Sequence, residues 1–280
     1  MLWVPQKGIV QVQHNAGEVG DVTIGAAVTT GATSPVKGTP VEIFASTSFD
    51  AYRIIIFARR YGLAATASDA CLDILTGAAT EEVLIPNLLA GCSGDPAVNA
   101  SERVGRSWDF PLYIPAGSRI AAQAAGDRVS TAMDVAVYLY GGHGIPPWRV
   151  GSKITTYGIG TVPDATTIVA GATGAEGAWT QIVASTSEAH FALFPGFSFN
   201  SDTSTSSRCV QVDIGHGAAT EEEVVNGSGW MFLNDNAEMM SGPWPCVPAF
   251  QDVPSGTRLT MRASCSGTAD TYMGAIHAVS

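Results

Sequence analysis

Apolar and polar residues alternate with a period of two in several stretches of the chain. The clearest runs are 135–140 and 258–265, where every second residue is apolar. This period predicts strands with one buried and one solvated face. The β-branched run Ile54-Ile55-Ile56 predicts a strand buried on both faces across 53–57. The segment 81–90 is compatible with one short helical turn, limited by Pro86.

Proline and glycine recur at matching places just before two of these strands. In Ile114-Pro115-Ala116-Gly117 and Val253-Pro254-Ser255-Gly256, proline occupies the second position and glycine the fourth. Proline fixes φ near −65°, so this spacing predicts a type I turn, with strands beginning at Arg119 and Arg258. Many short strands, few helical windows and regular turn signals predict an all-β protein built from jelly-roll-like or similar β-sandwiches.

Three blocks of sequence recur in the same order at an offset of 139 or 140 residues. They are Phe44-Ala45-Ser46-Thr47-Ser48 with Val183-Ala184-Ser185-Thr186-Ser187, Gly77-Ala78-Ala79-Thr80-Glu81-Glu82 with Gly217-Ala218-Ala219-Thr220-Glu221-Glu222, and Ile114-Pro115-Ala116-Gly117-Ser118-Arg119-Ile120 with Val253-Pro254-Ser255-Gly256-Thr257-Arg258-Leu259. Such a repeat predicts an internal duplication. Glycines and prolines at 141–147 break regular structure. We therefore expect two tandem domains, 1–142 with an N-terminal extension and 143–280.

The composition of the chain limits the kinds of molecule that it can bind. The 280 residues are 46% hydrophobic, which suffices for packed cores and excludes disorder as the main state. Only 14% are charged and the net charge is −11, which argues against a nucleic-acid partner because that affinity comes from Lys and Arg. Arg53, Arg59 and Arg60 have no basic counterparts in 189–200. Either one copy faces an acidic protein lattice through them, or the solvated faces of the copies have drifted.

Neither a membrane segment nor a secretory signal is expected. The longest uncharged run, 22–36, is shorter than the roughly 18 residues that a membrane helix requires. The N-terminus lacks a basic start followed by an apolar core, so we expect assembly in a cytoplasm. The five cysteines form no C-x-x-C pair and are expected to be reduced, mostly structural thiols.

No motif for catalysis, cofactor binding or metal binding stands out. The chain has no Gly-x-Ser-x-Gly, no phosphate-binding glycine loop and no histidine pair at ligand spacing. Glu81-Glu82 and 221–223 are candidate glycosidase carboxylates, but neighbours on a strand point to opposite faces, so solvated acidic turns are favoured. Residues 234–238 offer oxygen ligands for calcium without the rest of an EF-hand loop. We expect no enzyme, no cofactor and no metal site.

Three tryptophans, Trp108, Trp230 and Trp244, lie in glycine-, asparagine- or proline-rich stretches that should be loops. Exposed aromatic rings there would suit a sugar-binding platform. Large aromatics in such places more often pack the ends of a sandwich or fill a subunit interface, which is the favoured interpretation.

The run Phe110-Pro111-Leu112-Tyr113-Ile114-Pro115-Ala116-Gly117-Ser118-Arg119-Ile120-Ala121-Ala122, with 45–48 and 77–82 upstream, resembles β-sandwich modules in virion proteins of tailed bacteriophages. The resemblance covers most of 40–141 and, less closely, 179–280, where 242–246 departs from it. It implies a virion structural protein on the particle exterior, most simply a capsid decoration or cement protein. The expected partners are the major capsid protein and further copies of this chain. The alternative is a tail-associated adhesin that binds host-surface glycans through the loop tryptophans; a glycan hydrolase ranks last.

Overall fold

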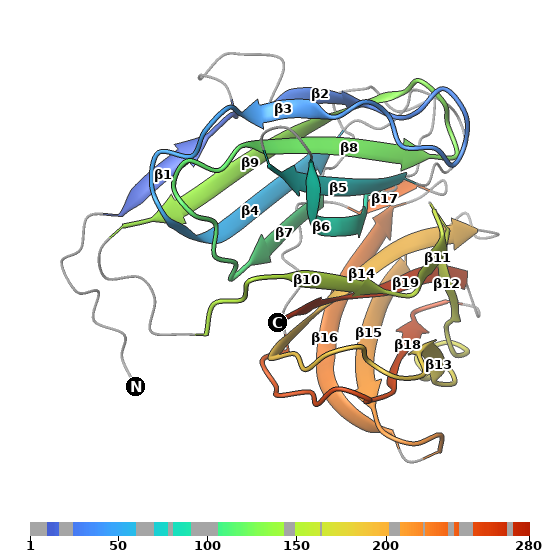
Figure 1. Ribbon diagram of the computed structural model, residues 1–280. Coiled ribbons are helices and arrows are strands. Elements are labelled where there is room, and N and C mark those ends of the chain that lie inside the picture. The colour runs from blue at the N-terminus through green and yellow to red at the C-terminus, as the bar shows by residue number, and fades with distance from the viewer. Residues whose placement is uncertain are drawn as a thin grey trace.

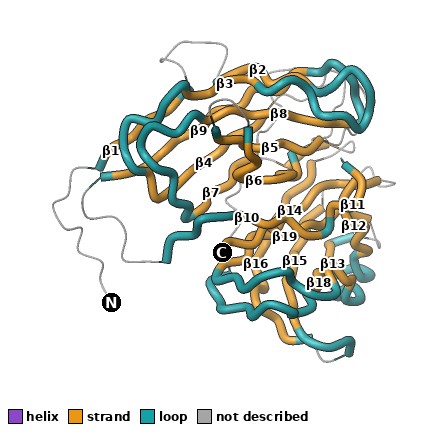
Figure 2. The backbone as a smooth tube through the Cα atoms, in the orientation of Figure 1, coloured by secondary structure: helices purple, strands orange, loops and turns teal. Residues whose placement is uncertain are grey.

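The computed structural model describes residues 10–16, 25–59, 70–77, 81–90, 106–142, 149–162, 164–201, 208–220, 222–234, 238–240, 249–267 and 271–280. Every regular element in these ranges is a β-strand, so the all-β expectation is confirmed (Figure 2). The ranges contain no helix that could cross a membrane.

The first nine strands form a sandwich of two sheets (Figure 1). One sheet has the order β1-β9-β4-β7, with β2 also paired to β9, and the other has the order β3-β8-β5-β6. This is the strand order of a jelly roll. The strands are β1 (Gln11–His14), β2 (Ala26–Thr29), β3 (Val41–Phe44), β4 (Ala51–Arg59), β5 (Ala70–Thr76), β6 (Glu82–Leu89), β7 (Arg106–Phe110), β8 (Ile120–Gly126) and β9 (Ala132–Gly141).

The remaining strands repeat this arrangement. One sheet is β10-β19-β12-β11, with β14 also paired to β19, and the other is β13-β18-β15-β16-β17. The strands are β10 (Ile154–Tyr157), β11 (Ile159–Thr161), β12 (Asp164–Val169), β13 (Thr180–Val183), β14 (Ala192–Ser201), β15 (Arg208–His216), β16 (Glu223–Asn234), β17 (Glu238–Met240), β18 (Leu259–Cys265) and β19 (Thr271–Val279). The domain boundary at 142/143 stays a prediction, because 143–148 lie outside the described residues.

The alternating runs bury the residues that the pattern selects. Val135, Val137 and Leu139 are fully buried in β9, whereas Tyr138 and Tyr140 are partly exposed. The triple isoleucine is a correction: in β4 the side chains at 54 and 56 are buried, but that at 55 is only half-buried. This strand therefore has one core face, like its neighbours, and is not buried on both sides.

The two sandwiches pack directly against each other. Phe194 and Val279 of the second sandwich belong to the same buried cluster as the core of the first. The rings of Phe110 and Phe194 meet edge-on, with centroids 4.7 Å apart. Backbone hydrogen bonds continue the contact, because the Tyr113 N–H donates to the Gly151 carbonyl over 2.8 Å. The two sandwiches thus share buried apolar surface, which resists their independent movement.

Two local predictions were wrong. Residues 82–89 form β6 and no helical turn; as the last strand of its sheet, β6 accommodates Pro86. The predicted type I turn is displaced by one residue: the Ser118 N–H donates to the Pro115 carbonyl and Gly117 has φ +82°. A positive φ at the third position is typical of a type II turn, which explains the glycine at 117 and at its counterpart 256.

The three repeated sequence blocks meet at this turn. In the first copy the Thr47 hydroxyl donates to the Pro115 carbonyl over 2.7 Å and accepts from the Ser118 N–H over 3.0 Å. The guanidinium of Arg119, which follows the turn, pairs with Glu81 over 2.5 Å. The blocks recur together because they are three parts of one contact.

In the second copy Thr186 makes the same bonds to Pro254 and Thr257, and Arg258 pairs with Glu222 over 2.8 Å. The hydrogen bond from Arg258 lowers the pKa of the Glu222 carboxyl. The interpretation of these glutamates as solvated acidic turns is therefore corrected for Glu81 and Glu222, whereas Glu82 is exposed.

Replacing Thr47 or Thr186, the buried threonines whose hydroxyls bond to the two turns, should destabilise the protein. Thr186→Val keeps the shape but removes two hydrogen bonds to backbone groups, as does Thr47→Val, and each variant should lose about 2 kcal/mol of unfolding free energy. Denaturant titration measures this loss. Thr173→Val, at an exposed threonine with one bond to the Gly267 carbonyl, is the matched control and should lose less than about 1 kcal/mol. Equal losses at all three positions would contradict the stabilising role of the two threonines that bond to the turns.

Candidate functional site

The outer face of the sheet β1-β9-β4-β7 carries aromatic and charged side chains. Successive strand residues point to opposite sides, so Arg53 and Phe57 of β4 point away from the core that Ile54 and Ile56 enter. Tyr138 and Tyr140 do the same on the neighbouring β9. We call His14, Arg53, Phe57, Asp109, Tyr138 and Tyr140 together the open face.

Side chains of the open face hold one another in place. Arg53 makes a two-pronged ion pair with Asp109, at 2.7 and 2.5 Å, and its guanidinium lies 5.3 Å from the centre of the Tyr140 ring. The hydrogen bond to Asp109 raises the pKa of Arg53, so its charge is permanent. Tyr138 stacks on His14 with ring centres 5.1 Å apart and meets the edge of Phe57 at 5.7 Å. These contacts fix the positions of the aromatic and charged side chains of the open face before any partner binds.

The second sandwich has the same face, but there it is covered. Strand pairing places Tyr138 of β9 opposite Ile55 of β4, and the corresponding pair in the second copy is His277 of β19 opposite Phe194 of β14. Both members of that second pair are fully buried and face Phe110 of the first sandwich. The chain therefore uses this sheet face once as a docking surface and leaves the equivalent face of the first sandwich partly exposed.

Of the residues singled out from the sequence, the structure places only Arg53 on this face. Trp108 is a correction, because it lies on β7 rather than in a loop and is 2% exposed in the core. The backbone of Arg59 ends β4, but its side chain, Arg60 and Trp244 lie outside the described residues. The backbone of Trp230 lies in β16 opposite Gln211, and its side chain is likewise outside.

The alternation in 135–140 placed Tyr138 and Tyr140 on the solvated face of their strand, but sequence reasoning did not single them out as candidate site residues. It also missed two histidines that are buried. His277 bonds through Nδ1 to the Thr156 hydroxyl over 2.9 Å, and His190 bonds through Nε2 to the Tyr157 hydroxyl over 2.9 Å. Burial lowers the pKa of both rings.

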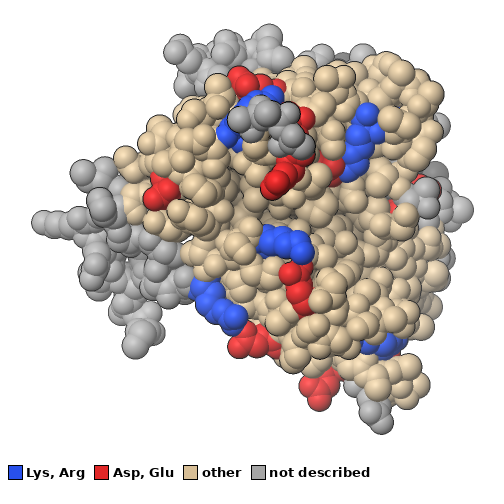
Figure 3. Space-filling view, in the orientation of Figure 1, with Lys and Arg blue, Asp and Glu red and all other residues tan. Residues whose placement is uncertain are grey.

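The described residues contain no group of three or more histidine, cysteine or acidic side chains that could hold a metal ion. Of the calcium candidates, Asp235 and Asn236 lie outside the described residues. Cys71 and Cys265 are buried thiols, whereas the side chain of Cys209 and both remaining cysteines fall outside. On the surface in Figure 3 charged groups are few, and basic and acidic ones lie beside one another.

Comparison with known protein families and with curated proteins finds no match. Among solved structures, the chain is similar to PNGF-II (TM-score 0.39, 7% identity), to STIV MCP (0.34, 10%) and to the CBM22-1-CBM22-2 tandem domain from Paenibacillus barcinonensis Xyn10C (0.28, 9%). Each alignment covers 97% of this chain, and 66%, 97% and 91% respectively of the other.

Proposed function

We propose that this protein is a structural component of a bacteriophage virion, most simply a capsid decoration or cement protein bound to the outside of the head shell. Its role is associative, with no bond made or broken in a substrate. The sequence resemblance set out above supports the virion assignment. The open face supports the associative role, because the matching face of the second sandwich is already buried as an interface.

The proposed mechanism is burial of this preformed face against other subunits. Aromatic rings and arginine are enriched where protein interfaces bury most area, and the open face presents both on rigid strands. A protein that binds only the assembled shell shifts the equilibrium toward assembly by mass action. The expected partners are the major capsid protein and further copies of this chain, assembled in the host bacterial cytoplasm.

Reversing the charge of Arg53 tests the proposal. Arg53→Glu should weaken binding to purified shells that lack this protein by at least about tenfold. The new carboxylate would lie beside that of Asp109 at the interface. Co-sedimentation with the shells measures binding. Lys153→Glu is the matched control, since Lys153 pairs with Glu188 over 2.8 Å on the second sandwich, and it should bind normally. Shells that bind both variants equally well, or that gain no heat resistance from the wild-type protein, would contradict the role.

A glycan-binding adhesin remains the second candidate, now carried by tyrosines. The rings of Tyr52 and Tyr113 lie 5.6 Å apart, and Tyr113 is exposed beside Asp50, to which its hydroxyl lies within 3.4 Å. Ring faces next to a carboxylate suit a sugar. Retention on immobilised host glycans that is lost in Tyr113→Ala, with shell binding absent, would favour the adhesin over the decoration protein.

A further inference from the structure

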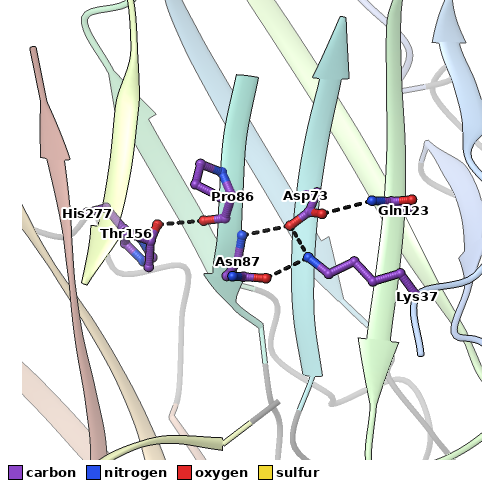
Figure 4. A network of polar contacts seen from close by, with 7 residues as sticks. All are labelled: Lys37, Asp73, Pro86, Asn87, Gln123, Thr156 and His277. Carbon is purple, nitrogen blue, oxygen red and sulfur yellow. Dashed lines mark hydrogen bonds and ion pairs between the residues drawn. The ribbon is translucent and has the colours of Figure 1, made fainter. Parts of the chain in front are cut away.

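A lysine, an asparagine and a buried aspartate meet on the outer side of the sheet β3-β8-β5-β6 (Figure 4). The Lys37 ammonium contacts the Asp73 carboxylate and also donates to the side-chain oxygen of Asn87 over 2.5 Å. The Asp73 side chain is only 3% exposed. The Asn87 N–H, at 2.7 Å, and the Gln123 amide, at 2.9 Å, hold the carboxylate in place.

From this geometry we propose that Lys37 and Asn87 are joined by an intramolecular isopeptide bond that the folded protein makes itself, with Asp73 as the proton carrier. The amine and the amide carbon are held together by the same contact that would otherwise be a plain hydrogen bond. Holding two reacting groups in one place removes the entropic cost of their encounter. The inference does not depend on the proposed virion role.

The chemistry balances without any co-reactant. Asp73 accepts a proton from the Lys37 ammonium, which leaves a neutral, nucleophilic amine. Nζ then attacks Cγ of Asn87, so that the Nζ–Cγ bond forms and the Cγ–Nδ2 bond breaks. The leaving nitrogen takes up one proton from the attacking amine and one from Asp73 and departs as ammonium, so the linked protein is lighter by one ammonia. One amide replaces another, no electrons are transferred, and the aspartate is returned to its starting state.

The backbone brings Asn87 to this position through a β-bulge. In the pairing of β5 with β6, Leu72 lies opposite Leu88 and Ile74 opposite Ile85, so two residues face Asp73 where a regular strand would place one. Asn87 is the second of these and has φ +50°, a left-handed conformation that asparagine tolerates better than most residues. Bulges re-aim side chains, and this one aims the amide at Lys37.

The second sandwich supplies an internal comparison in which only the aspartate is kept. The Gly38 N–H donates to the Ala124 carbonyl and the Gly177 N–H to the Ala263 carbonyl, so Lys37 corresponds to Glu176. Asp213 pairs with Arg262 over 2.8 Å, where the first copy has Asp73 opposite Gln123.

At the matching bulge, strand pairing leaves 227 and 228, glycine and serine, opposite Asp213. A buried aspartate paired with a cationic side chain is thus common to both copies, so this pair by itself is explained by the shared fold. A lysine amine that contacts an asparagine side chain at this place is seen, within the described residues, only in the first copy, between Lys37 and Asn87.

The bond would fasten the segment before β3 to the edge strand β6. That strand also contacts the second sandwich, because the Thr156 hydroxyl donates to the Pro86 carbonyl over 2.5 Å. A covalent link between 37 and 87 would close a long loop and so restrict the unfolded chain, as a disulfide does.

Intact mass spectrometry of the full-length protein under denaturing conditions tests the proposal. The wild-type mass should fall below the sequence mass by one ammonia, about 17 Da, and proteolysis should yield a branched peptide containing both Lys37 and Asn87. Lys37→Arg, which keeps the charge, should restore the full sequence mass and lower the Tm by on the order of 10 °C. Asp73→Asn should leave most molecules unlinked. Lys153→Arg, another ion-paired lysine, should keep the mass loss.

Two outcomes would overturn the inference. A wild-type protein with the full sequence mass has no such bond. A mass loss that persists in Lys37→Arg has another source, such as cyclisation of Asn226 onto Gly227, which also expels ammonia. The branched peptide is sought in the wild-type protein, so the test does not depend on any variant folding. Loss of shell binding in Arg53→Glu tests the virion role separately.

Discussion

Acidification should weaken the protein through His277, by roughly 3 kcal/mol of unfolding free energy at about pH 4 and roughly 5 kcal/mol below pH 3. Complete burial between the two sandwiches lowers the pKa of this histidine from its ordinary 6.5 to about 3. The unfolded chain therefore binds a proton that the folded chain does not. The stabilisation is fully present above pH 6.5 and is lost as the pH falls from 6.5 to the folded pKa of about 3.

The hydrogen bonds explain why the folded state rejects the proton. The Thr156 hydroxyl donates to the Pro86 carbonyl, so it accepts from His277 Nδ1, and the added proton would go to Nε2 (Figure 4). Within the described residues Nε2 has no hydrogen-bond partner, and Phe110 packs against the ring. A charged imidazolium there would be desolvated and half-satisfied.

Denaturant titrations between about pH 7 and pH 4 check this prediction. His277→Asn should flatten the dependence of stability on pH, and comparing slopes within each variant cancels the cost of the smaller side chain. His190 contributes with the same sign, because burial lowers its pKa as well, and Glu188 and Glu222 add to the loss only at lower pH, in the carboxylate range. An unchanged slope in His277→Asn would contradict the assignment.

Truncating Trp108 should be the most damaging single substitution of the first sandwich. Its ring is 2% exposed among the core residues, so Trp108→Ala removes a large apolar contact and leaves a cavity, at a cost of about 3–5 kcal/mol. Trp108→Phe should cost less because it refills most of the space. Tyr113→Ala, at an exposed ring, should cost less than about 1 kcal/mol.

Denaturant or thermal unfolding measures these losses, and shell or glycan binding should be tested only on variants that remain folded. A Trp108→Ala protein as stable as the wild type would mean that the ring is not in the core. The burial also means that lost sugar binding in this variant would report unfolding and would not identify a sugar platform.

Much of the local structure could be predicted from the chain. The period of two identified β9 and β18, and the repeated blocks predicted a duplication, because strand periodicity and turn chemistry depend on neighbouring residues. The displaced turn at Pro115 shows the limit of this reasoning. Both turn types accept proline and glycine, and only the backbone shows which residue carries the positive φ.

Much less of the candidate site could be predicted. Trp108 was predicted to lie in a loop from the glycine and proline near it in the sequence, yet β4 pairs with its strand and turns the ring into the core. The repeat offset matches Glu81 with Glu221, whereas the glutamate seen to pair with Arg258 is Glu222. Such assignments depend on which strands become neighbours, and that is not a local property.

The amino-acid sequence by itself determined that this protein is all-β, sparsely charged and rich in turns, and it predicted the duplication, because these features follow from composition, short-range pattern and repeated blocks. The tertiary structure alone decided that one sheet face is covered and its twin left open, that His277 is buried at the contact, and that Lys37, Asp73 and Asn87 meet. Residues far apart along the chain, such as Lys37 and Asn87 at 50 positions or Thr156 and His277 at 121, come together only once the strands pair and the sheets pack. The energy of burying them depends on what then covers them.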